Sequence, residues 1–106
     1  METSTRSRGK LSGAQRKWLR GMAHSLKPVV QVGKNGFTEA VIEQIDKALD
    51  DHELIKIQAP ATKEEKQELA RRIEEATGAE AVGLIGHILI LYRRNPDPEK
   101  RLYDLP

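Results

Sequence analysis

The chain has 106 residues and no cysteine, and its 18 basic and 16 acidic side chains give a formal net charge of +2. This length predicts a single domain that folds without metals or disulfides. The lack of cysteine excludes thiolate zinc sites and favours a reducing, cytoplasmic setting. The longest apolar run, from Ile88 to Tyr92, is far too short to cross a bilayer, so we expect no membrane partner.

The charge is unevenly distributed along the chain. Residues 1–36 hold eight Lys or Arg and one acid, a net charge of +7, whereas residues 37–106 hold ten Lys or Arg and fifteen acids, a net charge of −5. Chance together with a disordered basic tail could produce this pattern. The alternative, which we favour, is a basic surface that binds a polyanion.

The first expected helix follows a polar, basic segment, residues 1–10, that we expect to be disordered. Ser12 and Gln15 form a capping-box pattern at its start, and Pro28 should end it. Its apolar stripe is a core face rather than a base-stacking surface. The stripe consists of Ala14, Trp18, Leu19, Met22 and Leu26.

Two strand–helix pairs and a hairpin follow. Thr38 and Thr62 are expected N-caps of the second and third helices, and Gly78 should end the third. The Ile88–Leu91 run is apolar in both strand registers, which indicates a central strand covered on both faces. The expected strands are residues 29–32, 54–59, 82–85 and 88–92, and the last two are close enough to form an antiparallel hairpin.

This order, α-β-α-β-α-β-β, predicts an α/β fold of the two-layer α+β type with a four-stranded mixed sheet. We expect one folded domain over residues 11–94. The remaining residues, 95–106, include three prolines and should form an irregular tail.

A short loop, Gly33-Lys34-Asn35-Gly36, lies between the first strand and the second helix. Its two glycines permit a sharp turn, and the following helix directs unpaired N–H groups and its positive dipole end towards the loop. Lys34 adds a full charge. We expect Lys34 and the amides of Asn35 and Gly36 to bind a phosphate; the alternative is a turn that needs glycine for its geometry alone.

Six other basic residues are candidates for phosphate contacts. Those in the amino-terminal third are Arg16, Lys17, Arg20 and Lys27, and the last strand ends with Arg93 and Arg94. The alternative for the first set is a solvated helix face, and for the second it is ordinary charge at a strand end. The chain has only four aromatic residues, so it cannot build a stacking platform for bases. Binding should therefore depend on phosphates and shape, with strong salt dependence.

Catalytic and cofactor motifs are lacking. The three histidines are far apart without metal-ligand spacing, and no GxSxG motif is present. A P-loop would need a glycine where Pro28 stands and a Ser or Thr where Asn35 stands. We therefore expect no enzyme, no cofactor, no metal and no small-molecule substrate.

Three separated blocks of the chain resemble one family. Residues 19–36 (LRGMAHSLKPVVQVGKNG), 52–56 (HELIK) and 85–93 (IGHILILYR) are similar to the CRM domain, the chloroplast RNA splicing and ribosome maturation domain, in its YhbY-type single-domain bacterial form. The resemblance implies the fold of the C-terminal domain of translation initiation factor three, with strand order 1-2-4-3 and the fourth strand antiparallel. It also maps the family's GxxG loop onto Gly33–Gly36.

The resemblance further implies RNA binding and association with precursors of the large ribosomal subunit. We therefore expect a monomeric protein that contacts ribosomal RNA through the GxxG loop and a basic helix face and assists large-subunit assembly. One alternative is an adaptor whose acidic helices dock basic ribosomal proteins. Another is an enzyme that acts on a phosphorylated small molecule at the same loop.

Overall fold

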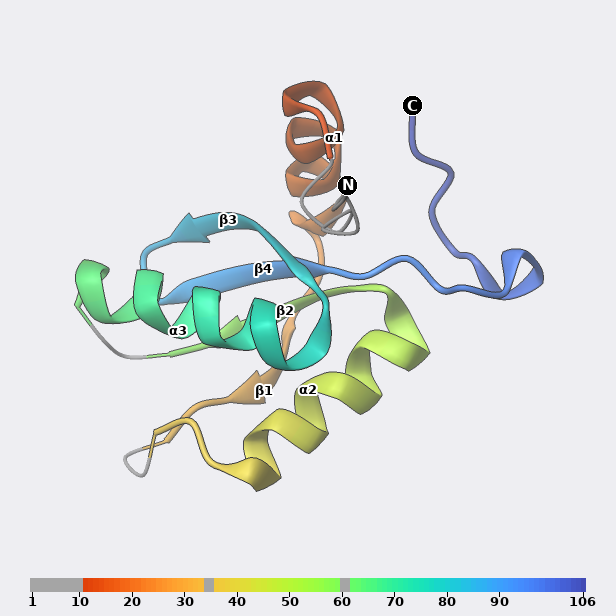
Figure 1. Cartoon of the computed structure of the whole chain (residues 1–106). Helices are drawn as coiled ribbons and strands as arrows, with labels where there is room; N and C mark the ends of the chain where they lie inside the picture. The colour runs from red at the N-terminus through yellow and green to blue at the C-terminus, as the bar shows by residue number, and fades with distance from the viewer. Residues whose placement is uncertain (1–10, 34–35, 60–61) are drawn as a thin grey trace, which may run out of the picture.

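The structure, a computed structural model, describes residues 11–33, 36–59 and 62–106 (Figure 1). The basic segment 1–10 lies outside the described residues. The elements in chain order are α1 (Gly13–Ala23), β1 (Pro28–Gln31), α2 (Glu39–His52), β2 (Leu54–Gln58), α3 (Lys63–Thr77), β3 (Glu80–Ile85), β4 (Ile88–Tyr92) and a short 3₁₀ turn (Pro98–Lys100).

The four strands form one mixed sheet in the order β1-β2-β4-β3. Strand β1 is parallel to β2, and β4 is antiparallel to both β2 and β3. Helices α2 and α3 cover one face, and α1 covers part of the other (Figure 1). These findings confirm the predicted fold class and strand order. They also explain the apolar β4 strand, which is central and covered on both faces.

Side-chain caps start the three helices at the predicted places. Ser12 and Gln15 form a reciprocal capping box, as do Thr62 and Glu65, and Thr38 Oγ1 accepts a hydrogen bond from the Val41 amide. Each cap satisfies amides that the first helical turn leaves without an internal partner. The caps therefore fix where each helix leaves the strand or loop before it.

Helix α1 ends earlier than the sequence predicts, at Ala23 rather than near Pro28. The Lys56 ammonium donates hydrogen bonds to the carbonyls of His24 (3.3 Å) and Leu26 (3.0 Å), which stabilises the chain after its last turn. The predicted stripe is also wrong at Met22, whose side chain is 43% exposed. Ala23 is fully buried in its place, because the helix packs through it and Leu19.

The core consists of two clusters, one on each face of the sheet. The larger joins the sheet to α2 and α3 through Ile45, Leu49 and Ile73, all at most 1% exposed. The smaller lies under α1, where Leu19 packs with side chains of β2, β3 and β4. Tyr103, from the carboxy-terminal segment, packs against this second cluster.

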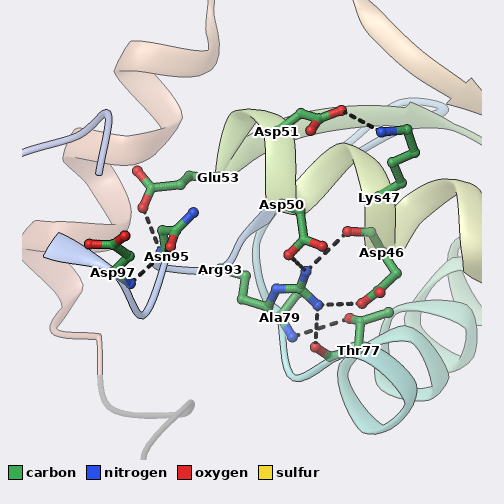
Figure 2. A network of polar contacts seen from close by, with 10 residues as sticks. All are labelled: Asp46, Lys47, Asp50, Asp51, Glu53, Thr77, Ala79, Arg93, Asn95 and Asp97. Atoms are coloured by element: carbon green, nitrogen blue, oxygen red, sulfur yellow. Dashed lines mark hydrogen bonds and ion pairs between the residues drawn. The ribbon is translucent and has the colours of Figure 1, made fainter. Parts of the chain in front are cut away.

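The carboxy-terminal segment contains the short 3₁₀ turn and is anchored to the domain by Glu53. This residue is fully buried, has a φ of 63° and lies between α2 and β2. Its carboxylate accepts hydrogen bonds from the amides of Asn95 (2.6 Å), Leu102 (2.7 Å) and Tyr103 (3.3 Å); Figure 2 shows the first of these. One buried carboxylate thus fixes both ends of the segment 95–103.

Candidate nucleic-acid interface

The Gly33–Gly36 loop follows β1, an edge strand of the sheet. The Gly36 amide donates to the Gly33 carbonyl at 3.0 Å, which closes a tight turn, and Gly36 has a φ of 75° that L side chains rarely adopt. The Gly36 amide is thus engaged within the turn, contrary to the expectation that it binds a phosphate. Lys34 and Asn35 lie outside the described residues.

Gly33 provides the open surface of the loop. It is exposed, and a Cβ built at Gly33 would meet no heavy atom within 4 Å. Its φ lies outside the left-handed region, so the backbone does not require glycine here. The absence of a side chain at Gly33 therefore leaves room for another molecule to approach the backbone closely.

The amino termini of two helices lie at this end of the sheet. Because β1 and β2 are parallel, their carboxyl ends lie at the same end of the sheet. Helix α2, which follows β1, and helix α3, which follows β2, therefore start at neighbouring positions. Between them lies a groove of about 840 Å³. It is lined by Gln31, Val32, Gly33, Gly36, Phe37, Gln58, Ala59, Glu64, Glu65, Glu68, Leu69 and Arg72.

Two of the three predicted basic residues of α1, Arg16 and Arg20, contact the opposite edge of the sheet. The guanidinium of Arg16 donates to the Ala81 carbonyl (2.8 Å) and that of Arg20 to the Val82 carbonyl (2.9 Å), both on the edge strand β3. The register of β3 shifts between Ala81 and Gly83, and a Cβ at Gly83 would lie 3.1 Å from Arg20 Cδ. Both arginines therefore attach α1 to an irregular sheet edge.

Arg16 also forms an ion pair with Glu80, whose side chain is only 4% exposed. Burial raises the pKa of the Glu80 carboxyl above its usual value of 4.5, and the Arg16 charge opposes this rise. Arg16 therefore compensates a buried carboxylate, a structural role that the sequence pattern did not reveal.

Arg93 is held between α2 and the end of α3, as Figure 2 shows. Its guanidinium donates to Asp46 (2.5 Å), Asp50 (2.8 Å) and the Thr77 carbonyl (2.7 Å), and its side chain is 20% exposed. This arrangement gives Arg93 a structural role on the acidic side of the molecule.

Lys17, Lys27 and Arg94 are exposed. Lys27 immediately precedes β1, and the six residue-to-residue steps from Lys27 to Gly33 span at most about 20 Å. The structure thus does not gather all the predicted cations around the loop: Arg16 and Arg20 lie on the β3 edge, and Arg93 lies against α2.

The sequence did not predict the groove, although it contains two signals for one of its walls, the spacing of three residues on α3 and the cap of that helix. Glu64, Glu68 and Arg72 have the i, i+4, i+8 spacing of one helix face. The capping box at Thr62 placed that face in the first turns of α3. That this face lies across from the glycine loop depends on the parallel pairing of β1 and β2, which spacing along the chain does not reveal.

The sequence pattern of the CRS1 / YhbY (CRM) domain matches residues 11–93. The chain belongs to the CRS1 / YhbY (CRM) domain family. A relative from Haemophilus influenzae, named RNA-binding protein, is 46% identical over 93 residues, which are 87% of this chain and 94% of the relative. The Bacillus subtilis protein named Probable RNA-binding protein YqeI is 35% identical, with coverage of 91% and 99% respectively.

The CRM-domain fold is also found in a solved structure. A Staphylococcus aureus protein determined in solution superposes with a TM-score of 0.77 at 38% identity, covering 91% of this chain and 99% of that protein. None of the described helices is long and apolar enough to cross a membrane. Among the residues that the structure describes, no three or more His, Asp or Glu side chains are grouped to bind a metal ion.

Proposed function

We propose that this protein binds ribosomal RNA by its phosphate backbone at the Gly33–Gly36 loop and assists assembly of the large ribosomal subunit. The observation that carries the proposal is the open, side-chain-free surface at Gly33, next to the start of α2 and a groove of about 840 Å³. Relatives that match nearly the whole chain are named RNA-binding proteins, which supports the choice of RNA as the polyanion.

The contacts divide into two sets. Lys34 and the Asn35 amide bind a phosphate at the loop, and Gly33 allows the RNA backbone to approach. Lys17, Lys27 and Arg94 are exposed and bind further phosphates. Arg20 is exposed as well, but one N–H of its guanidinium is already donated to β3, so its contribution is smaller. The protein acts as a monomer in this proposal.

Salt titration tests the electrostatic part. If three to five phosphates of a single strand are neutralised, log K falls against log salt with a slope of roughly −2 to −4. A slope near zero would contradict the proposal. It would favour an enzyme for a phosphorylated small molecule if mononucleotides then bound saturably.

A negative charge introduced at the loop tests the site itself. Gly33→Asp places a carboxylate in open space where the RNA phosphate is proposed to lie, and we expect RNA affinity to fall at least tenfold. The matched control is Ala76→Glu, which adds the same charge on exposed surface near the far end of α3. Equal losses in both variants, with folding intact, would remove the loop from the proposal.

Crosslinking in cells, followed by sequencing of the attached RNA, tests the target. We expect the reads to concentrate in large-subunit ribosomal RNA and to decline in Gly33→Asp. Reads spread over messenger RNAs in proportion to their abundance would contradict a role in subunit assembly.

An adaptor function has one specific observation in its favour. Helix α2 holds five acidic residues and one lysine, and Glu39, Glu43 and Asp51 are exposed. This surface could dock a basic ribosomal protein. Affinity capture after nuclease treatment distinguishes the two functions, because partners that persist without RNA support the adaptor.

A further inference from the structure

The groove beside the glycine loop has one wall made by α3. Glu64, Glu68 and Arg72 follow each other at intervals of four residues, so they form a ridge along one side of the helix. Glu65 and Leu69 form the neighbouring row, and Leu69 is 9% exposed. The exposed rim of this wall, formed by Glu64, Glu65, Glu68 and Arg72, is therefore polar and mostly acidic, and its buried base is the apolar Leu69.

The rest of the groove is lined by the side chains of Gln31 and Gln58, by the two loop glycines and by apolar residues that include Phe37. Val32 and Ala59, at the ends of two parallel strands, are 6% and 2% exposed and contribute to its lining. Phe37, at the start of α2, is half-buried, and the Arg72 guanidinium carbon lies 5.1 Å from the centre of its ring. A flat, partly apolar molecule could pack on these planar groups.

The charge of the rim limits what can enter. Hydrogen bonds from Thr62 lower the pKa of Glu65, and the bond from Arg71 lowers that of Glu68, so both carboxylates are ionised at neutral pH. Ionised carboxylates accept hydrogen bonds and donate none. They repel phosphates and the carbonyl oxygens of bases, and they attract N–H groups.

The carboxylates differ in what they already bind. Glu65 Oε1 accepts the Thr62 amide at 2.9 Å as part of the helix cap. Glu68 uses Oε2 for Arg71, at 2.6 Å, which leaves its Oε1 for another donor. Glu64, exposed in the first turn of α3, lies one turn away on the same ridge. Glu68 and Glu64 are therefore the acceptors that a guest in the groove would meet.

We propose that the groove binds an unpaired guanine of the RNA, with its Watson–Crick edge towards Glu64 and Glu68. Guanine is the RNA base that carries two adjacent donors on that edge, N1–H and the 2-amino group, and carboxylate oxygens of Glu64 and Oε1 of Glu68 are available to accept from them. Uracil presents one N–H between two carbonyl oxygens. Cytosine and adenine each place an acceptor nitrogen beside their amino group.

This base site rests on the proposed function, because the backbone of the same RNA lies on the Gly33–Gly36 loop. The groove volume of about 840 Å³ falls within the range of small-molecule sites in proteins. The guanine binds through its hydrogen-bonding edge and its flat faces, so no extended aromatic platform is needed. The site gives a sequence preference to a protein whose other contacts read only phosphates.

The test uses the full chain and three fluorescent octauridylates that differ at one central position, which is uridine, guanosine or inosine. Inosine keeps N1–H and lacks the 2-amino group. We expect the guanosine oligonucleotide to bind about tenfold more tightly than octauridylate, with inosine between them. Guanosine and uridine oligonucleotides that bind within twofold of each other would overturn the base site.

Variants of the two proposed acceptors test whether they cause the preference for guanosine. Glu64→Gln/Glu68→Gln should reduce the guanosine-to-uridine ratio towards one, although weaker repulsion raises affinity for both oligonucleotides. Glu75→Gln is the matched control, because Glu75 also pairs with Arg71 (3.2 Å) and does not line the groove. It should leave the ratio unchanged. A ratio that persists in the double variant, or that falls equally in the control, would overturn the assignment.

The same measurements separate this inference from the function on which it depends. Salt-dependent binding of octauridylate without a guanosine preference would contradict the base site and leave the backbone contacts standing. No salt-dependent binding of any oligonucleotide would contradict both.

Discussion

Helix α1 and the β1–α2 loop both belong to the basic third of the chain, but their surroundings in the structure are very different. In α1, the guanidiniums of Arg16 and Arg20 already donate to carbonyls of β3, and Arg16 also pairs with Glu80. At the loop, Gly33 faces open space. The comparison teaches that the basic residues of a sequence are not all available to a polyanion, because a sheet edge and a buried acid can engage them first.

Arg16→Ala tests the α1 side of this comparison and should have the largest effect. It leaves the buried Glu80 carboxylate without its ion partner, so we expect the free energy of unfolding to fall by about 2–3 kcal/mol. Urea denaturation measures this change. Lys17→Ala, one residue away on the exposed side, should change stability by less than about 0.5 kcal/mol. A folded Arg16→Ala protein with lost RNA binding and unchanged stability would reverse the roles we assign.

Gly36→Ala tests the loop side. The backbone at Gly36 has a φ of 75°, so an alanine should destabilise the protein by about 1 kcal/mol. Gly33→Ala is the natural comparison, because its added methyl group meets no atom within 4 Å and the φ of Gly33 lies outside the left-handed region. We expect thermal denaturation to show the loss in the first variant and almost none in the second. Equal stability of the two would mean that the turn rearranges.

Lys27→Ala examines the connection between the two regions. If this exposed lysine contacts one phosphate, its loss should weaken RNA binding about two- to threefold and make the salt slope shallower by about 0.7–1. Lys47→Ala, on α2 and paired with Asp51, is the control and should change neither quantity. A salt slope that is identical in wild type and Lys27→Ala would place the RNA path away from the start of β1.

The smallest expected effect is a pH dependence from Glu80. Because the pKa of this carboxyl is raised in the folded state, the folded protein holds its proton more tightly than the unfolded chain does. The stability contributed by this group is therefore greatest at pH below 4.5 and falls as the pH rises above that value. The difference in unfolding free energy between wild type and Glu80→Gln should decline as the pH rises above 4.5. A difference that grows over this range would contradict the assignment.

Local signals in the sequence predicted much of the fold. The caps at Ser12, Thr38 and Thr62 are correct because each depends on residues within one helical turn. The left-handed end of α3 at Gly78 is correct for the same reason. Strand order came from the resemblance to the CRM domain, since no local pattern specifies which strands pair.

The parts of the site that sequence could not predict depend on tertiary contacts. The roles of Arg16 and Arg20 arise from a register shift in β3, more than sixty residues away along the chain. The groove requires α3 to lie beside the glycine loop, which depends on the parallel pairing of β1 and β2. Charge counts therefore show that the first third of the chain is basic, but they do not tell which of its side chains the fold already uses.

The anchoring of the last residues by Glu53 has a consequence for synthesis. The amides that this carboxylate binds include those of Leu102 and Tyr103, so its buried position has no complete set of partners until the ribosome has translated past Tyr103, fifty residues after Glu53. The cluster under α1 likewise needs Tyr103 and Leu105 for its cover. A nascent chain can build the α2–α3 face first, but it can close its second core only once Tyr103 and Leu105 have left the ribosome.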